Sequence, residues 1–110
     1  MTFEIYQNKK NQSYFFNVIA GNGQAILTSQ GYKAKQSAQR GIASVKKNIA
    51  LERRFQPHSK RNGQHYFHLK AGNGEIIADS QLYPDEQSMQ RSIKSLMKTV
   101  GKAKVVDLTR

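Results

Sequence analysis

Apolar and polar residues alternate along several short stretches of this chain, which is typical of strands in a half-buried β-sheet. We expect strands at about 3–7, 14–19, 24–29, 53–58, 66–70, 75–80 and 105–108. Asn22-Gly23 and Asn73-Gly74 lie between the second and third strands of each set. They favour type I′ hairpin turns, because both residues tolerate positive φ.

Two longer stretches repeat their apolar residues every three or four positions, which predicts amphipathic helices. The first apolar stripe consists of Ala38, Ile42, Val45 and Ile49, and the second of Met89, Ile93, Leu96 and Val100. Asp85 is the expected N-cap of the second helix, because it can accept a hydrogen bond from a free backbone N–H of the first turn. The first helix has no equally good capping residue.

The chain contains the same structural unit twice. Ala20–Tyr32 aligns without a gap with Ala71–Tyr83, and the identities continue into both predicted helices. We therefore place repeat 1 at about 1–51 and repeat 2 at about 52–110. One repeat alone would bury too little apolar surface, and no flexible spacer separates the two. We expect residues 1–110 to form a single domain with a shared core.

Both repeats carry the same short motifs around the hairpin and the helix. In repeat 1 they are Ala20-Gly21-Asn22-Gly23, Ser29, Tyr32 and Gly41-Ile42-Ala43-Ser44-Val45-Lys46, and in repeat 2 Leu69-Lys70-Ala71-Gly72-Asn73-Gly74, Ser80 and Tyr83. This combination resembles the YegP-like family of small uncharacterised bacterial proteins. The resemblance implies an α+β fold built by tandem duplication of a β-β-β-α-β unit. It further implies one shared antiparallel sheet, two helices packed on one face and C-terminal strands exchanged between the repeats. It assigns no activity and no functional residues.

The composition is strongly basic. Eighteen Lys and Arg residues against seven Asp and Glu give a formal net charge of +11 in 110 residues. Such an excess attracts polyanions, although a generally basic surface without a dedicated site would also account for it. The absence of cysteine excludes disulfides, thiolate metal sites and cysteine nucleophiles. Without a signal-like start or a membrane-length apolar run, we expect a cytoplasmic protein with no membrane association.

Candidate catalytic or metal-binding residues are few. His65 and His68 point to opposite faces of a strand, so they cannot hold one metal ion together. His68 is expected opposite Asp79, which is half of a catalytic constellation. No positioned nucleophile accompanies them, and we interpret them as a polar cross-strand pair. The Ser and Tyr that recur after the third strand of each repeat are interpreted as structural. We expect no enzymatic activity, no cofactor and no metal.

The remaining candidate is a surface that binds nucleic acid, the ribosome or another polyanion. The cations expected there lie in and beside the two helices: Lys33, Lys35, Arg40, Lys46, Lys47, Arg91, Lys94 and Lys98. Phe15 and Tyr66 are candidates for base stacking on the open sheet face, unless they cover core at the repeat interface. We thus expect a non-enzymatic polyanion-binding monomer. A homodimer is the alternative assembly, and a structural or protein-protein interaction module is the alternative function.

Overall fold

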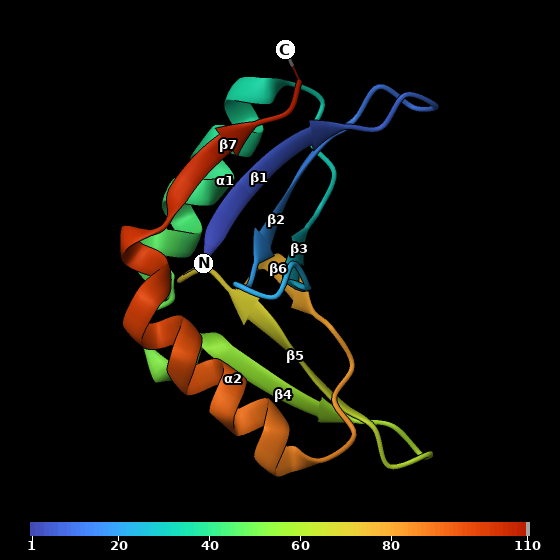
Figure 1. Cartoon of the computed structure of the whole chain (residues 1–110), viewed down its shortest axis with the longest axis vertical. Helices are drawn as coiled ribbons and strands as arrows, with labels where there is room; N and C mark the ends of the chain where they lie inside the picture. Colours follow the sequence, from blue (N-terminus) through green and yellow to red (C-terminus); the bar gives the residue numbers. More distant parts are fainter. Residues whose placement is uncertain (110) are drawn as a thin grey trace.

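A computed structural model describes residues 1–109 and contains a seven-stranded sheet with both helices on one side (Figure 1). The side chains of Thr99 and Val100 are outside the described residues, and with them the expectation for Val100. The strands are β1 (Thr2–Gln7), β2 (Tyr14–Ile19), β3 (Ala25–Ser29), β4 (Phe55–Ser59), β5 (His65–Lys70), β6 (Ile76–Ser80) and β7 (Lys104–Asp107). The helices are α1 (Lys35–Asn48) and α2 (Glu86–Thr99), with short 3₁₀ helices η1 (Glu52–Arg54) and η2 (Val100–Lys102).

The strand order is β4-β5-β6-β3-β2-β1-β7, so the two repeats meet at the centre of the sheet, where β3 pairs with β6. All neighbours are antiparallel except β1 and β7, which run parallel. The prediction of an antiparallel sheet is therefore wrong for this pair, and the sheet is mixed. The physical reason is that the α2 crossover returns the chain to the far edge in the same direction as β1.

β7 belongs to repeat 2 but extends the half of the sheet that repeat 1 forms (Figure 1). Leu108 N–H donates a hydrogen bond to Ile5 O at 2.8 Å, and Asp107 forms an ion pair with Lys35 of α1. At the end of repeat 1, the chain passes from α1 through η1 directly into β4. In the described part of the chain, repeat 1 thus places no strand beside β4 that would correspond to β7.

The outer edge of β4 lacks the backbone donors that a further strand would need. In an antiparallel pair, the N–H and C=O of one residue point to the same neighbouring strand. Phe67 N–H donates to Ser80 Oγ at 2.9 Å, towards β6, so its partner Pro57 directs its backbone to the free edge. Pro57 has no N–H, and Phe55 N–H donates to Glu52 O. This edge offers carbonyl acceptors only at the two positions.

One apolar cluster joins both helices to one face of the sheet, as the shared-core prediction requires. The described residues of both predicted helix stripes are buried, with exposed fractions of 4% or less: Ala38, Ile42, Val45, Ile49, Met89, Ile93 and Leu96. The sheet contributes fully buried rings and branched side chains, among them Phe3, Phe16 and Phe67. The helix facing predicted from the apolar spacing is therefore confirmed.

The turns before β3 and β6 differ from the prediction. Gly23 and Gly74 have φ values of 85° and 88°, whereas Asn22 and Asn73 are not among the described residues with positive φ. A type I′ turn needs positive φ at both central residues, so that assignment is wrong. Each Asn instead accepts a hydrogen bond at Oδ1 from the backbone N–H two residues later, and the ladder shifts register beside the turn. Only the Gly position requires the left-handed region.

The recurring Ser and Tyr are structural in both repeats, as predicted. Ser29 Oγ accepts a hydrogen bond from Phe16 N–H at 2.9 Å and donates to Gln30 O at 2.8 Å. Ser80 makes the same two contacts in repeat 2. Tyr32 stacks on the buried Phe16 ring with centroids 6.3 Å apart, and the equivalent pair of repeat 2 has the same separation.

The helix starts also follow the sequence. Ser88 N–H donates to Asp85 Oδ1 at 2.7 Å, so Asp85 caps α2. This hydrogen bond lowers the pKa of Asp85. Ala34 precedes α1 and makes no side-chain capping bond. Neither helix is long and apolar enough to cross a membrane within the described residues.

Candidate functional site

A row of polar side chains crosses the open face of the sheet, the face opposite the helices. Cross-strand register places the following residues in one line from β1 to β4: Glu4, Asn17, Thr28, Asp79, His68 and Gln56. The row passes from repeat 1 to repeat 2 between Thr28 and Asp79. The predicted pairing of His68 with Asp79 is confirmed by the register of β5 and β6.

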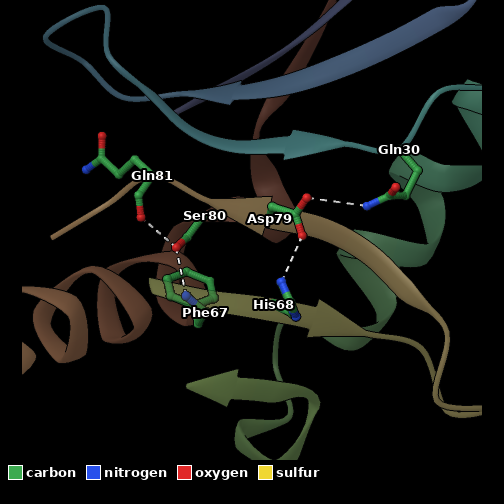
Figure 2. A network of polar contacts seen from close by, with 6 residues as sticks. All are labelled: Gln30, Phe67, His68, Asp79, Ser80 and Gln81. Carbon is green, nitrogen blue, oxygen red and sulfur yellow. Dashed lines mark hydrogen bonds and ion pairs between the residues drawn. The ribbon is translucent and has the colours of Figure 1, made fainter. Parts of the chain in front are cut away.

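Asp79 receives polar contacts from both repeats (Figure 2). His68 Nε2 lies 3.3 Å from Asp79 Oδ1, and Gln30 Nε2 donates to Asp79 Oδ2 at 3.5 Å. Gln30 follows β3 of repeat 1, whereas His68 and Asp79 lie on β5 and β6 of repeat 2. The carboxylate therefore connects the two halves of the open face.

Three rings gather next to this pair on the open face of repeat 2. Tyr66 stacks on His58 with centroids 5.0 Å apart, and the His58 ring lies 4.6 Å from that of His68. Burial lowers the pKa of His58, and the charges of His68 and Lys70 lower it further. His58 is thus neutral at neutral pH and supports the Tyr66 ring as an uncharged stacking partner.

A hollow of about 320 Å³ opens beside the rings. Its lining residues are Lys60, Tyr66, His68, Asp79, Ser80 and Leu82. Lys60 is exposed, and Leu82 leaves 46% of its surface exposed, so the wall combines a flexible cation with an apolar side chain. The hollow offers an aromatic side chain, an acid–base pair and a cation within one small volume.

Repeat 1 has different chemistry at the equivalent positions. Tyr66, His68, Asp79 and Leu82 of repeat 2 correspond in the repeat alignment to Phe15, Asn17, Thr28 and Gly31 of repeat 1. Phe15 stacks on Tyr6 with centroids 5.6 Å apart. The Phe15 ring also lies close to Gly31, since a Cβ added there would be 3.2 Å from Phe15 Cζ. The ionisable groups of the hollow are therefore specific to repeat 2.

Most of the predicted helix cations are exposed, on the side of the helices that faces away from the sheet. They are Lys33, Arg40, Lys47, Arg91, Lys94 and Lys98. Arg40 and Lys47 are two helical turns apart and lie opposite the buried stripe of α1. α1 contains no acidic residue, and the acidic residue of α2, Glu86, lies in its first turn. The outer surface of the helix layer is consequently rich in cations.

Two predicted cations have structural contacts instead. Lys35 forms the ion pair with Asp107 that ties β7 to α1, and the Lys35 hydrogen bond holds the pKa of Asp107 well below its usual range. Lys46 Nζ lies 5.6 Å from the centroid of the Phe3 ring, which is within the range of a cation–π contact. These two lysines are poorer candidates for phosphate contacts than the exposed ones.

The cations and the stacking candidates occupy opposite layers of the molecule. The helix cations cover one side of the sheet, whereas Phe15 and Tyr66 lie on the other, each half-buried and already stacked on a neighbouring ring. Sequence reasoning missed Lys60, Leu82 and His58 as neighbours of Tyr66. The Asn62-Gly63 turn was the available signal for His58, because a tight turn there brings the strand before it against Tyr66.

The fold and the open face define a tandem-duplicated α+β protein with one continuous sheet. The chain belongs to the family described as "Domain of unknown function (DUF1508)", which matches residues 9–55 and 61–107, one copy in each repeat. This agrees with the resemblance to YegP-like proteins.

Several relatives match over nearly their whole length. A UPF0339 protein of Acinetobacter baylyi is 47% identical over 97% of this chain and 96% of its own length. The UPF0339 protein YegP of Escherichia coli K12 is 45% identical over 86% of this chain and 84% of its own. The solution NMR structure of a UPF0339 protein from Shewanella oneidensis superposes with a TM-score of 0.91 at 37% identity, covering 98% of this chain and 91% of that one. The solution NMR structure of E. coli YegP, described as a protein of unknown function, gives a TM-score of 0.89 at 40% identity, covering 98% and 92%.

Proposed function

We propose that this protein is a non-enzymatic, cytoplasmic protein that binds nucleic acid through the helix layer, either free or within the ribosome. The observation that carries the proposal is the set of exposed cations on the outer faces of α1 and α2. Such cations contact phosphates irrespective of base sequence, and their binding releases condensed counterions. Affinity should therefore fall steeply as the salt concentration rises.

The distribution of acidic residues supports this assignment. Asp107 is engaged by Lys35, Asp79 by His68 and Gln30, and Asp85 by the start of α2. These carboxylates are held away from the outward faces of Arg40 and Lys47. In addition, η2 contacts α1, so the cation-rich end of α2 adjoins the first helix. A phosphate backbone could follow both helices along one side of the molecule.

The test compares two triple variants of equal charge. Arg40→Gln/Lys47→Gln/Lys94→Gln removes cations from the helix layer. Lys9→Gln/Lys10→Gln/Arg61→Gln removes two lysines and one arginine from the loops at the opposite side of the molecule (Figure 1). Binding of RNA, single-stranded DNA and duplex DNA is measured by filter binding over a salt series.

We expect the helix variant to bind all three nucleic acids more weakly and to lose up to about 0.9 in the magnitude of the log–log salt slope per lost duplex contact. The loop variant should retain most of the affinity. Equal losses in both variants would indicate a generally basic surface without a dedicated site. No salt-sensitive association of the wild type at low ionic strength would refute the proposal.

The alternative function, a protein-protein interaction module, is favoured by the exposed edge strand β7. Val105, Val106 and Leu108 expose 46%, 40% and 55% of their surfaces. Apolar side chains along a free strand edge are a common docking position for another chain. Replacing Val105 and Val106 with Thr would weaken such docking without changing the charge, and would leave nucleic-acid binding intact.

A further inference from the structure

We propose that the hollow on the open face of repeat 2 binds a small planar nitrogen heterocycle that carries a phosphate group, the chemistry of a nucleoside monophosphate. This site lies on the opposite layer from the helix cations, so it does not depend on the function proposed for them. The volume of about 320 Å³ falls within the range of about 300–1,000 Å³ typical of small-molecule sites.

The comparison between the repeats indicates that these groups are not needed for folding. Both repeats build the same hairpins and pack the same kind of helix, yet repeat 1 does so with Phe15, Asn17 and Thr28 in the equivalent positions. Folding is thus compatible with neutral residues in this row. A buried or half-buried acid–base pair costs desolvation free energy that a neutral pair avoids. His68 and Asp79 therefore call for an explanation other than stability.

The aromatic part of the ligand would lie against Tyr66. His58 stacks on the Tyr66 ring, and burial keeps His58 uncharged at neutral pH. Tyr66 is consequently held in place by its neighbour while it also lines the hollow. Leu82 adds an exposed apolar surface to the same wall. A flat ring can stack on such a side chain with little loss of side-chain entropy, because the platform is already ordered.

The polar groups specify the rest of the ligand. Asp79 can accept hydrogen bonds from ring or amino N–H groups, and Gln30 and His68 fix the position of its carboxylate. Lys60 is exposed at the hollow and has no ion pair within the described residues, so its ammonium is available to a phosphate. An acceptor deep in the wall and a free cation beside it match a base at one end of a ligand and a phosphate at the other.

The same chemistry could come from a free mononucleotide or from the end of a nucleic-acid strand. The experiment therefore titrates the full ¹⁵N-labelled chain with 5′-AMP, adenosine, inorganic phosphate and a trinucleotide, and follows amide shifts. We expect saturable shifts for 5′-AMP that centre on residues 60, 66, 68 and 79–82. Adenosine and phosphate alone should bind at least about tenfold more weakly. A trinucleotide that binds more tightly than 5′-AMP would identify a strand end as the source, and equal affinity a free nucleotide.

The variants use residues that the chain itself accepts at equivalent positions. His68→Asn/Asp79→Thr gives repeat 2 the pair that repeat 1 carries, and Lys60→Gln removes only the cation. Each should weaken 5′-AMP binding by about tenfold or more while the spectrum stays folded. Lys9→Gln in the other hairpin loop is the matched control and should bind normally. The helix-layer triple variant should also bind 5′-AMP normally, which separates this proposal from the preceding one. Absence of localised shifts with 5′-AMP, or unchanged affinity in both hollow variants, would overturn the assignment.

Discussion

The Tyr83 hydroxyl donates a hydrogen bond to Ser92 Oγ at 2.6 Å, whereas its counterpart in repeat 1, Tyr32, lies directly against Gly41. Both tyrosines are partly buried, and burial raises the pKa of each hydroxyl. The two repeats thus hold the same ring at the same helix position by different means. Repeat 2 uses a hydrogen bond, and repeat 1 uses the space left by a missing side chain.

The first prediction follows from that space. Gly41→Ala would place a Cβ 2.5 Å from Tyr32 Oη and 2.8 Å from Cε2 of the fully buried Phe16. We expect a loss of about 1–3 kcal/mol in the free energy of unfolding, although Ala favours helix over Gly by about 1 kcal/mol. Urea melts measure the change. Ala43→Gly, at an exposed position of the same helix, is the control for helix propensity alone. An unchanged or increased stability for Gly41→Ala would show that the contact yields easily.

The second prediction concerns the shared core. Ile42 and Ile93 occupy equivalent helix positions and are each 4% exposed. Replacing either with Ala should cost about 2–5 kcal/mol, because it removes buried methyl groups and leaves a cavity. Because both residues belong to one apolar cluster, each variant should lower the midpoint of a single transition. Two separate transitions in either variant would contradict a shared core.

The third prediction concerns the isolated first repeat. A fragment of residues 1–51 loses β6 from one edge of its three strands and β7 from the other. It also loses the apolar partners that repeat 2 supplies to the core. We expect the fragment to be unfolded or dimeric, as judged by sedimentation and by the dispersion of its NMR spectrum. A well-folded monomeric fragment would be incompatible with this expectation.

The fourth prediction is a pH dependence that originates from His58. Its pKa in the folded state is below the ordinary value of 6.5, mainly because it is buried. Between these two values the unfolded chain binds more protons than the folded one, so stability is complete above pH 6.5 and falls as the pH is lowered. His58→Phe should flatten the pH dependence of urea melts between pH 7.5 and 5. His65→Gln, on the other face of β5, is the control. An identical pH profile for His58→Phe and wild type would contradict the assignment.

The fifth prediction concerns the free edge of β4. Pro57→Ile would restore an outward N–H, so we expect self-association at lower protein concentration than in the wild type. One added hydrogen bond is worth about 0.5–1.5 kcal/mol, or up to about tenfold in the dissociation constant. Sedimentation velocity measures this. Gln56→Ile is the matched control, because it adds an apolar side chain while its N–H points towards β5. Equal association of both variants would attribute the effect to hydrophobicity.

The sequence predicted the local elements well because their signals are local. The apolar spacing of Ile42 and Ile93 placed both helix faces, and strand alternation placed His68 opposite Asp79. The parallel pairing of β1 with β7 was not predicted from the residue pattern, since it joins residues from opposite ends of the chain. The turn at Asn22 was assigned incorrectly because Asn-Gly is compatible with more than one backbone geometry.

The candidate sites were only partly accessible to sequence reasoning. The charge of Lys35 and Lys46 was visible, but their engagement by Asp107 and by the Phe3 ring depends on tertiary packing. The hollow was missed because Lys60 and Leu82 come from segments outside the strands that carry the rest of its wall. Proximity of this kind follows from the register of the whole sheet and leaves no periodic signal.

The parallel pairing of the first and last strands determines how the molecule would respond to a stretching force. Thr2 pairs with Lys104 and Ile5 with Asp107, so tension applied to the two termini pulls β1 and β7 in opposite directions along their length. The hydrogen bonds between them would be loaded together in shear and would have to break collectively. The remaining strands lie beyond this pair and would bear no load until it failed. The mechanical strength of the protein should thus reside in its two terminal strands.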